Sequence, residues 1–324
     1  MEFENFPKFK DVESSIIKLK KNGFPDFEEN IDVAKFVEGI SKILTNEFGI
    51  LPNLLKKFRH QELALKFFRA RDIETISNIN LIREHSYPPI NSTGMGRCNF
   101  PKFPVFYCSD NPMTALIEVA KDINFLDKKY CISKWELLSP NEELIFQSFL
   151  QTKLPKQNQY ISVRDNLNKN INKPFQKSLN KNLDKEREKG LLEYLEFLDT
   201  NFINDGSYSL SASLAYRALY SDHNFSTDIL MYPSVQTQSK GVNMALNPNF
   251  VENNLKLSRL YVVETPDYDK DKNIFQITFI KYAEVEKNQI MWKEIKQNDK
   301  DFYQLMKEDF GNILNMKKAN KQNN

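Results

Sequence analysis

The apolar runs of this chain do not alternate regularly between strand and helix patterns, and this order restricts the fold more than any other feature. Short runs rich in β-forming residues occur at 104–108, 228–232, 260–264 and 274–285. Helical patterns separate them at irregular intervals, whereas a doubly wound sheet needs a regular strand–helix alternation. We therefore predict an α+β fold with a mixed sheet surrounded by helices. The last two runs are expected to pair across the turn-rich segment 265–273.

Three regions are expected along the chain. Residues 1–64 form an N-terminal helical extension, in which 31–48 shows helical spacing and a basic amphipathic run at 54–68 continues the helices. Residues 65–285 form the central domain, with a polar, lysine-rich surface insertion at about 150–190. Residues 286–324 supply a C-terminal helix and a disordered tail.

Composition excludes some classes of function and leaves others open. The net charge is only +2, so bulk electrostatics do not indicate a nucleic-acid partner. The three cysteines are too few and too unevenly spaced for a disulfide framework or a zinc site, so we expect no metal and interpret them as small buried hydrophobes. No apolar stretch reaches the roughly 20 residues that span a bilayer. The first residues also lack the features of a secretory signal, so a cytoplasmic location is expected.

A glycine-containing segment, Gly94–Pro101, carries Arg97. Glycine lets a backbone approach a ligand closely, and a guanidinium beside such a loop can grip a phosphate with two hydrogen bonds. Asn99 stands where the third glycine of the dinucleotide-binding fingerprint would fall, so a Rossmann dehydrogenase is unsupported. Taken alone, the segment fits a turn that exposes an arginine better than it fits a phosphate-binding loop.

A strand-to-helix transition follows this segment. The run 104–108 reads as a buried strand that includes Tyr107. Asn111 is placed to cap the next helix and Pro112 to occupy its first turn. Glu118 would then lie on that helix. Tyr107 is also consistent with a core residue, and Glu118 with a solvated helix face.

Three more polar residues are candidates for the same binding site. Arg69 and Arg71 lie on one face if their segment is extended, because side chains alternate along a strand. Ser234 follows a strand-like run directly. The serine is also consistent with an ordinary turn.

The ordered set of these stretches resembles the RES domain family, over roughly residues 65–250. The matching stretches are Phe-Arg-Ala-Arg (68–71), Gly-Arg-Cys-Asn (96–99), Phe-Pro-Val-Phe-Tyr (103–107), Thr-Ala-Leu-Ile-Glu (114–118), Tyr-Ser-Leu-Ser (208–211), Tyr-Pro-Ser-Val (232–235) and Gly-Val-Asn (241–243). The resemblance implies a fold like that of ADP-ribosyltransferases. It also implies a bacterial toxin that breaks down NAD+ by hydrolysis or phosphorolysis, with NAD+ as substrate rather than cofactor, phosphate as a potential acceptor and an antitoxin protein as a potential partner.

The resemblance also implies roles for individual residues. Arg69 and Arg97 would hold the dinucleotide, with Arg71 the substitute for Arg69, and Tyr107 would lie against the nicotinamide. Glu118 would stabilise the positive charge that develops on the ribose, as in glycoside transfer. Ser234 would complete the site by hydrogen bonding. It is not interpreted as a nucleophile, because the sequence places no histidine as its base.

Two other functions remain open from the sequence. An ADP-ribosyltransferase would use the same intermediate but transfer the ADP-ribose to a protein or nucleic acid. A non-catalytic binding module would use the lysine-rich insertion to contact nucleic acid, with a steep salt dependence.

Overall fold

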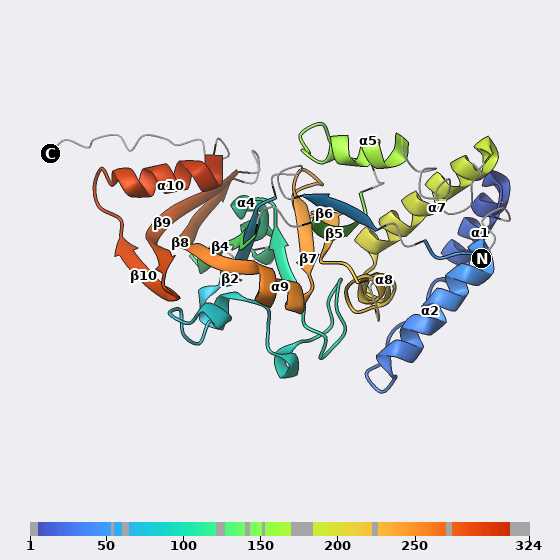
Figure 1. The fold of residues 1–324 in the computed structure, drawn as a ribbon, viewed down its shortest axis with the longest axis horizontal. Coiled ribbons are helices and arrows are strands. Elements are labelled where there is room, and N and C mark those ends of the chain that lie inside the picture. Colours follow the sequence, from blue (N-terminus) through green and yellow to red (C-terminus); the bar gives the residue numbers. More distant parts are fainter. Residues whose placement is uncertain are drawn as a thin grey trace. The chain divides into compact units, whose positions relative to one another are not determined.

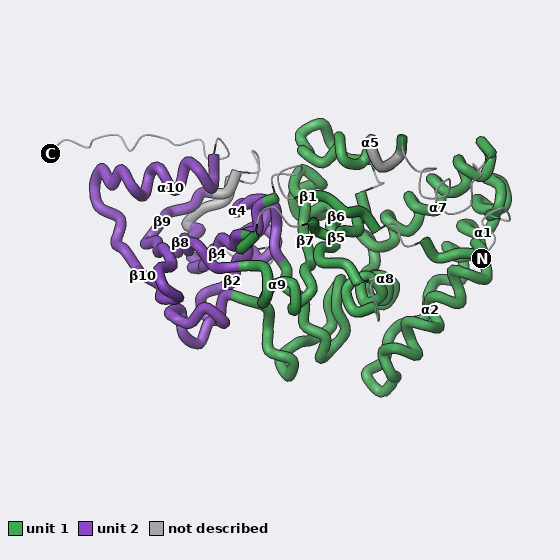
Figure 2. Tube along the Cα trace, viewed as in Figure 1, with its two compact units in different colours: residues 1–65, 86–107, 137–255 green, residues 66–85, 108–136, 256–324 purple. Residues whose placement is uncertain are grey.

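The computed structural model divides the chain into two compact units that interleave along the sequence (Figure 2). Unit 1 comprises Met1–Leu65, Ser86–Tyr107 and Leu137–Leu255, and unit 2 comprises Lys66–His85, Cys108–Glu136 and Lys256–Asn324. The structure describes residues 6–52, 55–59, 65–120, 127–139, 143–150, 153–169, 184–221, 226–269 and 274–311.

Unit 1 contains most of the described helices (Figure 1). They are α1 (Phe9–Asn22), α2 (Val33–Phe48), α5 (Ile161–Lys169), α7 (Lys185–Asn204), α8 (Ser209–Leu219), α9 (Pro248–Asn254) and the short 3-10 helix η4 (Ile90–Ser92). Helix α1 packs against α7, and α2 packs against α8. Gly190 permits the first contact, because a Cβ there would lie 3.1 Å from the carbonyl oxygen of Pro7.

Aromatic side chains hold the helices of unit 1 together. The rings of Phe48 from α2 and Tyr194 from α7 stack with their centroids 3.9 Å apart. The Tyr194 hydroxyl donates a hydrogen bond to the carbonyl oxygen of Ile50 at 3.1 Å. Both rings are fully buried. The contact therefore holds the segment that follows α2 in place against α7.

The strands of unit 1 follow the order β1-β5-β6-β7. Their bounds are Lys56–Arg59 for β1, Glu143–Ser148 for β5, Ile229–Pro233 for β6 and Val242–Leu246 for β7. The β5–β6 pair is parallel, whereas β1–β5 and β6–β7 are antiparallel. Every residue of β6 and β7 is buried. These two strands are therefore covered on both faces.

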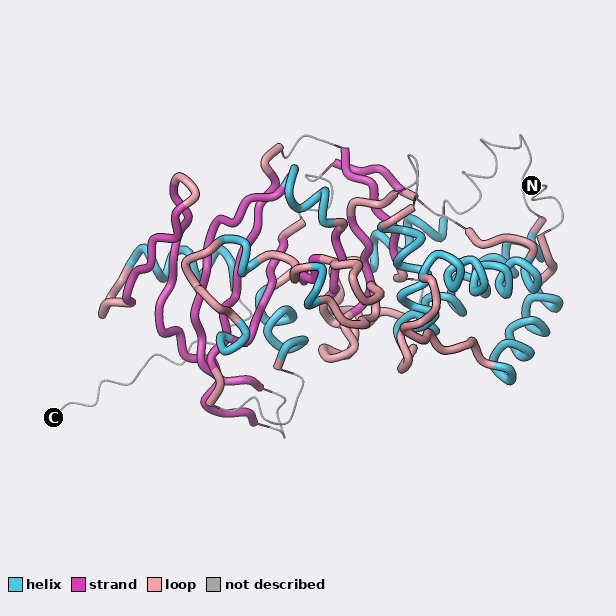
Figure 3. The backbone as a smooth tube through the Cα atoms, turned by 90° about the horizontal axis from the view of Figure 1, so that it is seen from below, coloured by secondary structure: helices cyan, strands magenta, loops and turns pink. Residues whose placement is uncertain are grey.

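Unit 2 contains the longer strands, and Figure 3 shows them running side by side. The strands, in their order across the sheet, are β3 (Phe106–Ser109, whose last two residues belong to this unit), β2 (Phe67–Asp72), β4 (Lys129–Leu137), β8 (Leu255–Asp269), β9 (Ile274–Glu286) and β10 (Gln289–Glu294). The other elements are α4 (Pro112–Val119), α10 (Lys300–Phe310) and the 3-10 helices η2 (Ile73–Thr75) and η3 (Ile82–His85).

One buried carboxylate, together with apolar side chains that include Phe302 and Phe310, attaches helix α10 to the strands of unit 2. Asp309, only 4% exposed, accepts a hydrogen bond from the hydroxyl of Tyr261 on β8 at 2.7 Å. The ammonium of Lys134 on β4 lies 2.8 Å from the same carboxylate, and Arg259 on β8 lies 3.2 Å from it. The two cations compensate the buried charge, which would otherwise be costly.

Most sequence predictions of the fold are confirmed. The described residues combine helices with a mixed set of strands, as expected for an α+β fold. The expected helices near the N-terminus are also present. The runs 260–264 and 274–285 pair antiparallel, with Leu260 opposite Ala283. Asn111 caps α4 with its side chain and Pro112 lies in the first turn. The three cysteines are buried and free. The described residues contain no helix long and apolar enough to cross a membrane.

Two predictions about local structure are wrong. The helical pattern at 54–68 is instead strand at both ends, because Lys56 pairs with Phe146 and Phe68 with Lys134, which lie far away in the sequence. The polar segment at 150–190 is not a mobile surface insertion throughout. Its residues 153–169 are structured, and Asn158 and Tyr160 are buried. The final residues, 317–324, lie outside the described part of the chain.

Candidate functional site

The loop that carries Arg97 is closed by backbone and side-chain hydrogen bonds within unit 1. The amide of Gly96 donates to the carbonyl of Asn99 at 3.0 Å, and the amide of Asn99 donates back at 3.2 Å. The side-chain amide nitrogen of Asn99, Nδ2, also donates to the carbonyl of Gly94 at 2.6 Å and to that of Phe100 at 3.1 Å. Asn99 is buried, so these bonds fix the loop from inside.

Tyr107, on β3, connects to the same loop through its hydroxyl. The hydroxyl donates to Oδ1 of Asn99 at 2.7 Å and accepts from the amide of Cys98 at 2.8 Å. Burial is the main reason that the pKa of Tyr107 is raised well above its usual value. The phenol therefore stays neutral and can keep both bonds at physiological pH.

Gly96 is required by this arrangement. A Cβ at position 96 would lie 2.6 Å from Oδ1 of Asn99 and 3.0 Å from the Tyr107 hydroxyl. Both atoms are held by hydrogen bonds and cannot withdraw without breaking them. The glycine is therefore selected here by close approach of side chains, not by a left-handed backbone.

Arg97 is half-buried and is oriented by helices α7 and α8 of the same unit. Its Nη1 donates a hydrogen bond to the carbonyl of Phe202, near the end of α7. Its guanidinium carbon lies 5.3 Å from the ring centroid of Tyr208, which precedes α8. A guanidinium has five N–H donors, so these contacts orient the side chain and leave it able to bind an anion.

Cys98 follows Arg97 and is not a candidate nucleophile. Its side chain is fully buried, and burial raises the pKa of its thiol to about 12. Only a thiolate attacks effectively, and this thiol is protonated at neutral pH.

Ser234 lies directly after β6, as predicted, and begins a tight turn in unit 1. Its amide donates to the carbonyl of Gly241 at 3.0 Å, and its hydroxyl accepts from the amide of Thr237 at 3.2 Å. Asn158 supports the turn from outside by donating its side-chain amide to the carbonyl of Ser239 at 2.8 Å. The serine is fully buried, so its hydroxyl can bond only to groups that directly adjoin it.

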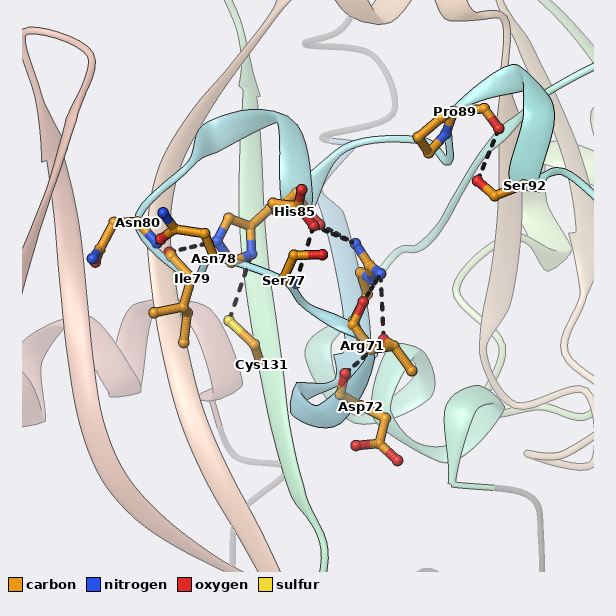
Figure 4. Close-up of polar contacts among 12 residues, drawn as sticks. Arg71, Asp72, Ser77, Asn78, Ile79, Asn80, His85, Pro89, Ser92 and Cys131 are labelled. Carbon is orange, nitrogen blue, oxygen red and sulfur yellow. Dashed lines mark hydrogen bonds and ion pairs between the residues drawn. The ribbon is translucent and has the colours of Figure 1, made fainter.

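In unit 2, Arg69 and Arg71 project from the same face of β2, as the extended pattern predicts. Arg71 uses its two terminal nitrogens structurally. Nη1 donates to the carbonyl of Glu84, and Nη2 donates to the carbonyl of Thr75 at 2.6 Å (Figure 4). Arg71 therefore fastens the segment after β2 to the strand. The backbone carbonyl of Arg69 accepts a hydrogen bond from the hydroxyl of Ser133 at 3.0 Å.

The segment that Arg71 fastens also contains a buried histidine. Nε2 of His85 lies 2.9 Å from the carbonyl of Ile79, and Nδ1 lies 3.7 Å from the sulfur of Cys131 (Figure 4). Since a carbonyl can only accept, Nε2 carries the proton and Nδ1 presents its lone pair to the thiol. Burial lowers the pKa of His85 and raises that of Cys131 to about 12. Both groups are therefore neutral.

Glu118 is half-buried on α4, which packs against the other face of β2. Met113 and Leu116 of α4 share a core cluster with Phe68 and Ala70 of β2. Side chains alternate along a strand, so Arg69 and Arg71 occupy the positions that alternate with Phe68 and Ala70.

Unit 1 thus brings Arg97 and Tyr107 to one loop, and unit 2 puts Arg69 and Arg71 on one strand face. Two contributors were not predicted from sequence. Asn99 stands where a third glycine would fall and ends a matching stretch, but neither feature predicts that its side chain fixes the loop. Tyr208 occurs in a matching stretch, but nothing in that stretch indicates that its ring lies over Arg97.

A family model described as RES domain matches residues 76–141, and this confirms the resemblance over that span. The span includes Arg97, Tyr107 and Glu118, whereas Arg69, Arg71 and Ser234 lie outside it. No protein among those with curated descriptions matches the chain.

Proposed function

We propose that the protein is an enzyme that cleaves the bond between nicotinamide and ribose in NAD+, with water or phosphate as acceptor. One observation carries the proposal: the RES domain match contains Arg97, Tyr107 and Glu118, three residues of the types that this reaction needs. The RES domain family is associated with NAD+-related toxin function. We accordingly propose a role as a toxin that a partner protein neutralises, in the cytoplasm of a bacterium.

Arg97 is proposed to bind the pyrophosphate of NAD+. Its guanidinium is already oriented by the Phe202 carbonyl and the Tyr208 ring, so little side-chain entropy is lost when a phosphate binds. The loop that carries it is fixed by Asn99 and Tyr107. This fixed position supports a role in orienting the substrate, which is itself a source of rate acceleration.

The bonds held by Tyr107 refine its proposed role. Its hydroxyl is used by Cys98 and Asn99. Any contribution to nicotinamide would therefore come from the ring face, while the hydroxyl keeps Arg97 in place. Arg69 is assigned to the substrate in preference to Arg71, because backbone carbonyls hold both terminal nitrogens of Arg71.

Glu118 is proposed as the catalytic carboxylate. When the C–N bond breaks, its electron pair goes to the nicotinamide nitrogen, which was positively charged and leaves neutral. No general acid is needed, but the ribose gains positive charge. A carboxylate stabilises that oxocarbenium-like state electrostatically. Water or phosphate then attacks the anomeric carbon, and a water nucleophile releases a proton to solvent. The Ser234 hydroxyl is proposed to hydrogen-bond the ribose or carboxamide.

The test is chromatography of the products after the purified full chain is mixed with NAD+, with and without inorganic phosphate. Release of nicotinamide with no macromolecular acceptor supports the proposal. ADP-ribose without phosphate indicates hydrolysis, and a phosphorylated ADP-ribose indicates phosphorolysis. If nicotinamide appears only after a protein or nucleic acid is added, the transferase function replaces the proposed one. If none appears under any condition, the proposal is wrong.

A further inference from the structure

Tyr232, the last residue but one of β6, lies between two parts of unit 1 that carry proposed site residues. Its side chain is buried in the same core cluster as Cys98 and Phe202. Ser234 comes two positions later, directly after the strand. Every residue of β6 is buried, and the strand pairs with β7 along its whole length, with Tyr232 opposite Asn243. The position of Tyr232 in the core therefore sets the position of Ser234.

The first contact of Tyr232 is with Phe202, in the last turn of α7. The two rings meet edge to face, with their centroids 5.4 Å apart and an interplanar angle of 62°. Phe149 stacks on the ring of Phe202 with a centroid distance of 4.0 Å. The backbone carbonyl of Phe202 accepts the hydrogen bond from Nη1 of Arg97. The packing of Phe202 against Tyr232 therefore helps to fix the group that orients the guanidinium.

The second contact of Tyr232 reaches the loop of Arg97 directly. Its hydroxyl donates a hydrogen bond to the sulfur of Cys98, the residue that follows the arginine. The backbone amide of Cys98 donates in turn to the hydroxyl of Tyr107 at 2.8 Å. Cys98 is thus held at its side chain by β6 and at its backbone by β3.

Two routes therefore connect Arg97 to β6, one through the Phe202 carbonyl and one through Cys98, and both end at the side chain of Tyr232. A substrate that Arg97 and Ser234 hold together needs these two residues at a fixed separation, because a displacement of about 1 Å can cost about 100-fold in rate. We propose that Tyr232 is a positioning residue that holds Ser234 in a fixed place relative to Arg97. This inference rests on the NAD+ cleavage proposed above and adds a residue that does not itself touch the substrate.

Initial-rate kinetics of the full chain carrying Tyr232→Leu test the proposal. We expect KM for NAD+ to rise at least about fivefold, because the two proposed binding groups lose their common support. The value of kcat should change less, since the proposed catalytic carboxylate is not altered. Tyr194→Leu is the matched control, because Tyr194 is an equally buried tyrosine of unit 1 whose ring stacks on Phe48. It should lower stability in urea but leave KM unchanged.

A change of background shows whether Tyr232 acts through the two site residues. In a chain that already carries Arg97→Ala and Ser234→Ala, Tyr232→Leu should lower kcat/KM by no more than about twofold, because residues of one network are not additive. If Tyr232→Leu causes the same fold-loss in this background as in the wild type, Tyr232 acts independently of both residues and the proposal is wrong. A KM that rises equally in Tyr194→Leu would also overturn it.

Tyr232→Phe provides a second variant in case Tyr232→Leu does not fold. It keeps the ring against Phe202 and removes only the hydroxyl that bonds Cys98. We expect a smaller rise in KM, about two- to threefold, that disappears when Arg97→Ala and Ser234→Ala are present. If the wild type releases nicotinamide but the Tyr232 variants that fold keep its KM, only the positioning role is wrong. If the wild type releases none, the proposed cleavage is wrong and the positioning role falls with it.

Discussion

The hydroxyl of Tyr107 donates a hydrogen bond to Oδ1 of Asn99 at 2.7 Å, and this bond joins β3 to the loop that carries Arg97. The same hydroxyl accepts from the amide of Cys98, so one oxygen fixes both residues that follow the arginine. A tyrosine that a family resemblance assigns to the substrate thus also has a structural task. Loss of the hydroxyl alone should affect the structural role but keep the ring that would contact the substrate.

Tyr107→Phe keeps the ring and removes the hydroxyl. It leaves the Cys98 amide without its partner, which should cost about 1–3 kcal/mol in the free energy of unfolding. If Tyr107 positions Arg97, KM for NAD+ should rise several-fold while kcat changes little. Urea unfolding and initial-rate kinetics measure these effects. Tyr303→Phe, at an exposed position, is the matched control. A stable variant with an unchanged KM would contradict the positioning role.

Glu118→Gln removes the proposed catalytic charge with almost no change in shape. We expect turnover to fall by about 100-fold or more, equivalent to about 2.7 kcal/mol of barrier, while NAD+ still binds. Nicotinamide release and equilibrium binding are the measurements. Glu186→Gln, on the exposed first turn of α7, should retain full activity. Wild-type turnover by Glu118→Gln would remove this residue from the mechanism.

Arg97→Ala should weaken substrate binding and lower kcat/KM, because the proposed pyrophosphate contact and its orientation are lost together. A tenfold to hundredfold fall in kcat/KM is expected, about 1.4–2.7 kcal/mol. Tyr208→Leu removes only the ring that lies over the guanidinium and should give a smaller fall in the same direction. If Arg97→Ala leaves kcat/KM unchanged, the loop does not bind the substrate.

The buried histidine should make stability depend on pH. Burial lowers the pKa of His85 in the folded state, whereas the unfolded chain titrates near 6.5. The unfolded state therefore binds the proton first. Stability from this residue should be complete above pH 6.5 and fall at lower pH, by up to about 1.4 kcal/mol per unit, until the folded pKa is reached. Urea unfolding between pH 8 and 5 measures the slope. His85→Gln should have a shallower slope, and an equal slope would exclude this histidine as the cause.

Features that depend on neighbouring residues were predictable from the sequence. Asn111 and Pro112 begin α4 as predicted, because a capping side chain bonds to amides only a few residues ahead. Long-range pairing was not predictable. The run at 54–68 has helical spacing, yet Lys56 pairs with Phe146, which is 90 positions later.

The candidate residues show the same division. The position of Arg69 on a strand and that of Ser234 directly after a strand follow from local patterns. The structural use of Arg71 depends on the carbonyls of Thr75 and Glu84, which side-chain patterns do not reveal. The contact between Arg97 and Tyr208 joins residues 111 positions apart. No local rule connects them.

The carboxylate of Asp309 should be the most sensitive polar group in the attachment of α10 to unit 2. It is 4% exposed and is shared by the Tyr261 hydroxyl and the cations of Lys134 and Arg259. Asp309→Ala would leave both cations, whose side chains are 14% and 18% exposed, without this partner. Removal of one partner from a buried ion pair typically costs about 3–5 kcal/mol.

A second substitution separates the charge from the hydrogen bond. Asp309→Asn can still accept from Tyr261 but carries no charge, so its loss should fall between those of Asp309→Ala and the wild type. Glu308→Gln changes the adjacent carboxylate, which pairs with Arg259 at 2.9 Å but is 45% exposed. Such a pair should contribute no more than about 1 kcal/mol. Urea unfolding of the three variants gives the ranking. If Glu308→Gln destabilises as much as Asp309→Ala, Arg259 acts through the exposed carboxylate, and the buried one does not hold the helix.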